Sequence, residues 1–209
     1  MTLPFRTPFF LPLLYPELVW RMNPTEKELY LTFDDGPIPN VTEWVLATLN
    51  QFNISATFFV IGDNVRKHPD VFKEIINNNH SVGNHTFHHV KGWQTQTEKY
   101  LNEIAMCDAI MQQTSASFNN DLFRPPYGRI TKEQRKKLDN KKIIMWDVLT
   151  QDYNQNIGKE KCLEGSIKAL RSGSIIVMHD SLKAERNLKY ALPRLLEFAL
   201  NQGYIFKKL

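Results

Sequence analysis

Residues 29–37 read Leu-Tyr-Leu-Thr-Phe-Asp-Asp-Gly-Pro, and this stretch decides how the rest of the chain is interpreted. Its apolar start is typical of a buried strand, and Asp34 and Asp35 follow where the strand ends. Neighbouring side chains on an extended backbone point in opposite directions, so one carboxylate could bind a metal while the other acts as a base. A solvated Asp-Asp-Gly turn is the alternative, because Gly36-Pro37 favours a tight turn.

The composition of the 209-residue chain, with 42% apolar and 23% charged residues, is that of an ordinary globular protein. Its length suits one large domain. The net charge of +4 is spread along the chain. We interpret its densest basic cluster, residues 135–142, as the end of a helix and expect no nucleic-acid partner. Cys107 and Cys162 fall in helix-like segments, which predicts reduced, buried thiols.

The first 28 residues differ from the rest of the chain. Residues 9–14 are mostly apolar, but prolines at positions 4, 8, 12 and 16 interrupt the stretch, and no small-residue cleavage site follows. We interpret residues 1–28 as an arm that packs on a domain formed by residues 29–209, with contact to a membrane surface as the alternative. No stretch is long enough to span a bilayer, and a cytoplasmic location is expected.

Short apolar runs alternate with segments of helical periodicity from residue 29 onward. This alternation predicts a parallel sheet covered by helices, and roughly seven strands favour a barrel-like α/β domain over an open sheet. Functional sites in such folds gather at the C-terminal ends of the strands. Strands are expected at 29–33, 56–61, 80–84, 142–146, 174–178 and 204–206, and helices at 40–52, 70–78, 98–111, 131–138, 161–171 and 188–201.

A second polar cluster, residues 85–89, places His85 and His89 four positions apart. On a helical turn both imidazoles would share one face and could bind one metal. With Asp35 they would form a set of two histidines and one carboxylate, which is common in catalytic zinc sites. A coincidental surface pair is the alternative. His88 is expected to have a supporting or surface role.

Three further clusters are weaker signals on their own. Residues 124–128, Arg-Pro-Pro-Tyr-Gly, form a rigid turn that could hold a carboxylate through Arg124 or aim a backbone N–H at an oxyanion. Residues 146–153 offer aromatic and acidic groups, as a sugar site would. The apolar strand at 174–178 delivers His179 at its end, where an imidazole could donate a proton near neutral pH. A plain loop or a structural histidine is the alternative reading.

In this order, the five clusters resemble the motifs of the polysaccharide deacetylase family, the NodB-like domain of carbohydrate esterase family 4. The resemblance extends from about residue 30 to the C-terminus. It implies a distorted (β/α) barrel with fewer than eight strand-helix units and a metal-dependent N-deacetylase. The matching stretches are Thr32-Phe33-Asp34-Asp35-Gly36, His85-Thr86-x-x-His89, Arg124-Pro125-Pro126-Tyr127-Gly128, the region of Asp152-Tyr153, and Val177-Met178-His179.

The resemblance implies that four residues at the first two motifs carry the chemistry of water activation. Asp34 would be the general base. Asp35, His85 and His89 would bind a divalent metal, usually zinc in this family.

The remaining motifs would complete the reaction, again as the resemblance implies. Arg124 would orient the base, and Tyr127 would lend its backbone N–H to the oxyanion. His179 would be the general acid, and Asp152 would hold it in orientation and protonation.

The implied activity is removal of N-acetyl groups from an N-acetylglucosamine-containing glycan, such as peptidoglycan or a chitin-like oligosaccharide, by attack of an activated water. The chain departs from the family pattern at Leu149, where members often have Asp, and at Tyr153, where they often have Trp. Both changes would reshape the wall that faces the sugar. The alternatives are a deacetylase or deformylase of a lipid-linked amino sugar, which the apolar arm motivates, and a non-catalytic carbohydrate-binding relative.

Overall fold

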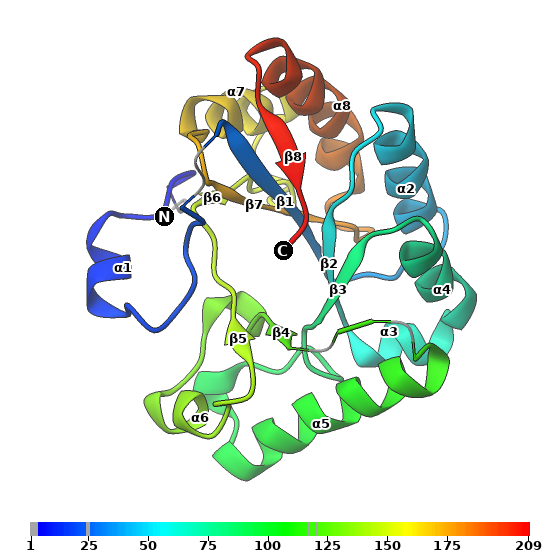
Figure 1. Cartoon of the computed structure of the whole chain (residues 1–209), viewed down its shortest axis with the longest axis vertical. Helices are drawn as coiled ribbons and strands as arrows, with labels where there is room; N and C mark the ends of the chain where they lie inside the picture. The colour runs from blue at the N-terminus through cyan, green and yellow to red at the C-terminus, as the bar shows by residue number, and fades with distance from the viewer. Residues whose placement is uncertain (1–3, 24–25, 117, 120) are drawn as a thin grey trace.

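The computed structural model describes residues 4–23, 26–116, 118–119 and 121–209, and its centre is a parallel sheet that curls into a barrel-like form (Figure 1). The strand order is β5-β4-β3-β2-β1-β7-β6, and β8 pairs with β1. The expected barrel-like α/β architecture is thereby confirmed. The strands are Glu28–Asp34 (β1), Thr57–Val60 (β2), Ser81–Asn84 (β3), Leu122–Phe123 (β4), Lys142–Ile143 (β5), Val148–Leu149 (β6), Ile175–His179 (β7) and Ile205–Lys207 (β8).

Helices surround the sheet on its outer side (Figure 1). Six of them were expected from the sequence; α1 and α3, of five and six residues, were not. The helices are Phe10–Leu14 (α1), Val41–Gln51 (α2), Gly62–Lys67 (α3), Pro69–Asn77 (α4), Thr97–Thr114 (α5), Lys132–Lys136 (α6), Lys159–Ala169 (α7) and Glu185–Asn201 (α8), with short 3-10 turns at Gly92–Gln94 (η1) and Pro126–Gly128 (η2).

Strand β1 has one apolar face and one polar face, and the polar face carries residues of the candidate site. Leu29, Leu31 and Phe33 belong to the main hydrophobic core between the sheet and the helices. Thr32 and Asp34 point to the other face, where both accept hydrogen bonds from Arg124. The barrel interior is therefore polar at the C-terminal end of β1.

The two ends of the sheet meet at residues 142–149. Ile144 N donates to Phe123 O at 2.8 Å on the β4 side, and Asp147 N donates to Ile175 O at 3.0 Å on the β7 side. No helix separates β5 from β6, so one extended segment connects both edges. The sequence predicted a single strand at 142–146; the segment instead forms β5, crosses the gap and forms β6.

The N-terminal arm lies along the outside of this closing segment. Leu149 N donates to Phe5 O at 2.8 Å, and Met145 N donates to Val19 O at 2.7 Å, so the arm contacts both sheet edges. Between these contacts, Phe9, just before α1, is 81% exposed, and Leu13 and Leu14 of α1 are 75% and 64% exposed. Among the described residues, no helix has the length and apolarity that crossing a bilayer would need. The domain boundary at residue 29, the location and contact with a membrane surface stay predictions.

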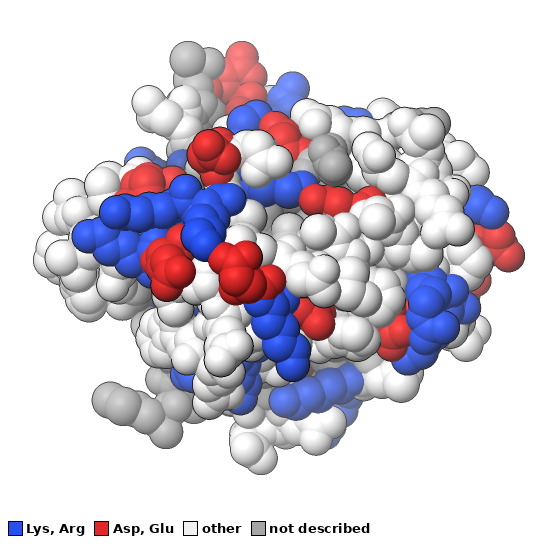
Figure 2. Space-filling model, turned by 90° about the horizontal axis from the view of Figure 1, so that it is seen from below, with Lys and Arg blue, Asp and Glu red and all other residues white. Residues whose placement is uncertain are grey.

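The basic cluster at 135–142 forms ion pairs with acidic side chains. Four of its five cations pair with acids from the arm, from α5 and from the segment before β4, and Figure 2 shows cationic and acidic residues interspersed over this face. The pattern matches the interpretation as a solvated helix end. The pairs are Arg135 with Glu17, Lys137 with Glu98, Lys141 with Asp108 and Lys142 with Asp121. Cys107 and Cys162 are buried free thiols, as predicted.

Candidate active site

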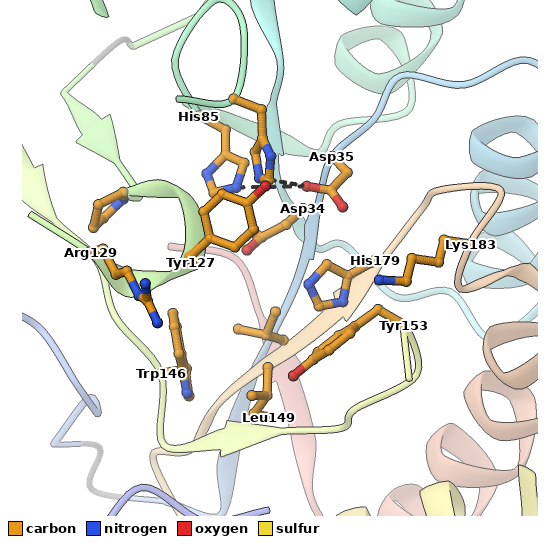
Figure 3. A pocket seen from close by; sticks show the side chains of 13 residues that line it. Asp34, Asp35, His85, Tyr127, Arg129, Trp146, Leu149, Tyr153, His179 and Lys183 are labelled. Atoms are coloured by element: carbon orange, nitrogen blue, oxygen red, sulfur yellow. Dashed lines mark ion pairs between the residues drawn. The ribbon is translucent and has the colours of Figure 1, made fainter. Parts of the chain in front are cut away.

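A cavity of about 360 Å³ opens where strands β1, β3 and β7 end, and residues from all five sequence clusters line it (Figure 3). The C-terminal edge of a parallel sheet is where such a fold collects functional side chains. The lining comprises Asp34, Asp35, His85, His89, Pro125, Tyr127, Arg129, Trp146, Leu149, Tyr153, Val177, His179 and Lys183. Arg124 and Asp152 lie beneath this surface, fully buried.

Asp35, His85 and His89 form a candidate metal site. The His89 Nε2 atom lies 3.3 Å, and the His85 Nε2 atom 3.8 Å, from Asp35 Oδ1. One ligand atom from each residue falls within 4.8 Å of the others. One carboxylate and two imidazoles leave further coordination positions for water and substrate.

The protonation of the two histidines suits metal binding. The Nδ1 atom of His85 lies 2.7 Å from the backbone carbonyl of Arg124, so this nitrogen donates and Nε2 keeps its lone pair. Burial, together with the charge of His89, lowers the pKa of His85 to about 3, and burial also lowers the pKa of His89. Both imidazoles are neutral near pH 7, as ligands must be. The residues present therefore fit a divalent metal.

The loop that carries the histidines is not a helical turn, the arrangement for which the sequence analysis considered a shared face. Strand β3 ends at Asn84, and positive φ values of 65° at Thr86 and 55° at His89 turn the backbone. The Asn84 side chain accepts from Thr86 N at 2.8 Å and holds the first turn. This turn, and not helical spacing, brings the rings of His85 and His89 to a centroid separation of 5.0 Å. His88 is half-exposed and contacts the buried carboxylate of Glu103.

Asp34 points into the cavity with a buried arginine behind it. Arg124 Nη1 donates to Asp34 Oδ1 at 2.6 Å and to Thr32 Oγ1 at 2.7 Å. The guanidinium also donates to the carbonyl of Met145 at 3.0 Å and stacks 4.1 Å above the Phe59 ring. These contacts fix the side chains of both Arg124 and Asp34. Asp34 is therefore held as a carboxylate separate from Asp35.

His179 ends β7 in direct register with Asp34 on the neighbouring strand β1. The Asp152 carboxylate accepts from His179 N at 2.7 Å and contacts His179 Nδ1 at 2.8 Å. Burial alone would lower the pKa of His179, but the charge and hydrogen bond of Asp152, with smaller effects of Asp35 and Asp34, raise it to about 9. His179 is therefore protonated near pH 7.

Aromatic and aliphatic side chains form the cavity walls. The Tyr153 ring meets His179 edge-on at 5.0 Å, and Leu149 lies beside it in the lining. Trp146 packs on the opposite wall against Gly128, where an added Cβ would lie 2.5 Å from the indole. The Tyr127 ring lies 4.6 Å from the His89 ring, and its backbone has a φ of 60°. The use of its N–H toward an oxyanion stays a prediction.

Asp180 is a residue of this site that the sequence motifs did not single out. Its carboxylate is buried and accepts from Gly36 N at 3.1 Å and from Thr42 Oγ1 at 2.6 Å. Burial raises its pKa to about 8. It thus fixes the turn that carries Asp35. The one sequence signal was the glycine itself, since a Cβ at Gly36 would lie 2.0 Å from Asp180 Oδ2.

Comparison with known sequences gives consistent matches. A family model described as polysaccharide deacetylase matches residues 21–145. A peptidoglycan-N-acetylglucosamine deacetylase of Bacillus cereus is 32% identical over 193 residues, which cover 90% of this chain and 89% of the relative. The peptidoglycan-N-acetylglucosamine deacetylase PgdA of Listeria monocytogenes is 34% identical over 186 residues, or 87% of this chain, but the match spans only 38% of that longer relative.

Solved structures show the same architecture. The crystal structure of the Bc1960 peptidoglycan N-acetylglucosamine deacetylase superposes with a TM-score of 0.89 at 29% identity, covering 97% of this chain and 95% of that one. A CE4 family pseudoenzyme from Bacillus anthracis matches with a TM-score of 0.82 at 23% identity, covering 91% and 66%, and shares the fold alone. Because a pseudoenzyme has this fold, activity must be argued from the residues of the site.

Proposed function

Because the chain belongs to the polysaccharide deacetylase family, we propose that it is a metal-dependent hydrolase that removes N-acetyl groups from an N-acetylglucosamine-containing glycan, with peptidoglycan as the preferred substrate class. One observation carries the proposal: a free carboxylate, a three-residue ligand set and a protonated imidazole line the same cavity. The relatives named above are peptidoglycan deacetylases, which favours peptidoglycan over a chitin-like polymer.

Asp35, His85 and His89 would hold the metal, and zinc is the ion that this donor set commonly binds. A divalent ion bound there would polarise the amide carbonyl and lower the pKa of a water. Asp34 is not one of the three ligands and is fixed by Arg124. It is placed to accept the proton of the attacking water as a general base.

The leaving amine requires a proton donor on the other side of the cavity. His179 lies in register with Asp34 and carries a proton near pH 7 because its pKa is raised to about 9. It would protonate the amino nitrogen as the C–N bond breaks, and Asp152 would stabilise the imidazolium. The backbone N–H of Tyr127 would stabilise the oxyanion. The products are acetate and a free amino sugar.

Release of acyl groups from a panel of substrates tests the proposal. The panel contains N-acetylglucosamine oligomers, peptidoglycan fragments and lipid-linked amino sugars, each with and without chelator. Chelator-sensitive acetate release from peptidoglycan fragments supports the proposal. Release from lipid-linked sugars alone favours the lipid-linked alternative. Glycan binding without any release identifies a non-catalytic relative.

A further inference from the structure

Two cationic side chains line the cavity from opposite sides. Arg129 follows the turn η2, and Lys183 lies in the turn between β7 and α8. Figure 3 shows Arg129 beside Trp146 on one side and Lys183 beside Tyr153 on the other. Asp34, Asp35 and His85 lie between the two sides. The mechanism above uses neither cation.

Both cations contact aromatic rings and not acidic side chains. The Arg129 guanidinium lies 5.0 Å from the centroid of Trp93, and Lys183 Nζ lies 5.7 Å from the centroid of Tyr153. Within the described part of the chain, neither forms an ion pair, whereas Arg66 has an acidic partner in Asp63. A ring positions a cation without cancelling its charge, so both charges are available to a ligand.

Trp93 lies beside Arg129, which lines the cavity. Its ring is 63% exposed, although its Nε1 donates to Ile130 O at 3.2 Å and its position is thereby fixed. A fixed, exposed indole next to a guanidinium offers an apolar face for a sugar ring and a fork for an anion.

The arrangement of the cavity indicates where an anionic group of the substrate would bind. Asp34 and the metal ligands lie in the middle of the cavity, where the reacting acetamide would be held. At Arg129 or Lys183, a carboxylate would meet an unpaired cation. With the reacting acetamide in the middle, a carboxylate bound by either cation would belong to a neighbouring unit of the glycan.

We propose that Arg129 and Lys183 bind carboxylates on the units that flank the reacting sugar, so that the site selects an acidic glycan over a neutral N-acetylglucosamine polymer. This inference rests on the proposed function. In a peptidoglycan-like polymer, the carboxylate can come from an acidic sugar or from a peptide attached to it. Arginine binds either in a bidentate manner.

The test compares three substrates: a neutral N-acetylglucosamine tetramer, a peptide-free tetrasaccharide with alternating acidic sugars, and the same glycan carrying peptides. In Arg129→Gln and Lys183→Gln, we expect kcat/KM on the acidic substrates to fall on the order of tenfold each, mainly through KM, as for loss of a charge-assisted hydrogen bond. The loss on the neutral tetramer is expected to be several-fold smaller. A loss confined to the peptide-bearing glycan assigns the carboxylate to the peptide.

Two matched controls carry the same type of contact away from the cavity. Arg194 stacks 4.1 Å from the Tyr190 ring, and Lys27 lies 5.7 Å from the Tyr204 ring. Arg194→Gln and Lys27→Gln should keep the wild-type ratio of activities on acidic and neutral substrates. An equal loss on all substrates in the Arg129 and Lys183 variants, or no loss, overturns the inference.

Calorimetric binding of the same three glycans separates this inference from the proposed function. If the wild type releases no acetate from any of them, the proposed function fails. The inference then still requires the acidic glycans to bind more tightly than the neutral tetramer, and the double variant to lose that preference. Equal affinities for acidic and neutral glycans would contradict it.

Discussion

Arg124 and Asp34 form a pair that water hardly reaches: their closest atoms lie 2.6 Å apart, and the two side chains are 0% and 5% exposed. Arg124 also donates to Thr32 and to the backbone carbonyls of Ile144 and Met145, so each guanidinium nitrogen has a partner. A buried charge can be retained only with such partners. The pair joins the β1 motif to the Arg-Pro-Pro-Tyr-Gly turn, and thus links the stability of the barrel interior to the position of the base.

Arg124→Met should destabilise the protein by about 3–5 kcal/mol, because it leaves Asp34 as a buried carboxylate without its counter-charge. Urea denaturation measures the effect. Arg66→Met is the matched control, since Arg66 pairs with Asp63 on an exposed helix and should cost less than about 1 kcal/mol. An equal loss of unfolding free energy in the two variants would show that the buried ion pair does not hold Asp34 in place.

Asp152→Asn should shift the alkaline limb of the pH–rate profile to lower pH. The acid role requires protonated His179, whose pKa is raised to about 9, so the wild type should stay active up to about that pH and lose activity above it. Removal of the Asp152 charge leaves burial as the dominant effect, which lowers the pKa of His179. The measurement is kcat between pH 6 and 10. An alkaline limb that does not move would remove Asp152 from this role.

His85→Ala should lose bound metal together with activity, because only two ligands of the site would be left. His88→Ala is the matched control: this neighbouring imidazole is half-exposed and contacts Glu103 instead of Asp35. Elemental analysis of the purified variants gives the metal content, and chelation with re-addition of metal tests the dependence. A metal-free His85→Ala protein with full activity would overturn the metal role.

Gly36→Ala should impair both stability and activity, because the new Cβ would lie 2.0 Å from the Asp180 carboxylate and push the Asp35 turn out of place. Overpacking of this kind costs about 1–3 kcal/mol. Gly158→Ala is the control, since its Cβ would meet only the end of the Glu160 side chain at 3.4 Å. Thermal unfolding and acetate release measure the two effects. Wild-type behaviour of Gly36→Ala would show that the contact with Asp180 does not position the turn.

Sequence reasoning was most informative where a signal is local. The apolar run before Asp34 predicted β1, and helices were expected to begin at residues 40 and 131. Asn40 N indeed donates to Glu43 at 2.6 Å, and Thr131 and Gln134 exchange hydrogen bonds. These features depend on a few neighbouring residues, so the sequence contains all the information they need.

Other features depend on residues far apart in the chain. Asp180 reaches Gly36 across 144 positions, and apart from the glycine itself nothing near either residue indicates the contact. The four-residue spacing of His85 and His89 suggested that a helical turn could bring them together; positive φ at Thr86 and His89 achieves the same convergence without a helix. The exposed cations Arg129 and Lys183 carried no sequence signal, since surface lysines and arginines are common.

The most direct test of the central assignment is a pair of neighbouring variants, Asp34→Asn and Asp35→Asn, measured for metal content and for acetate release. Asp34→Asn should keep the metal content of the wild type and lose turnover by about 10²–10⁴-fold, since a general base contributes that much. Asp35→Asn should lose metal and activity together. Substantial turnover by Asp34→Asn, or loss of metal from it, would contradict the division of the two carboxylates into base and ligand.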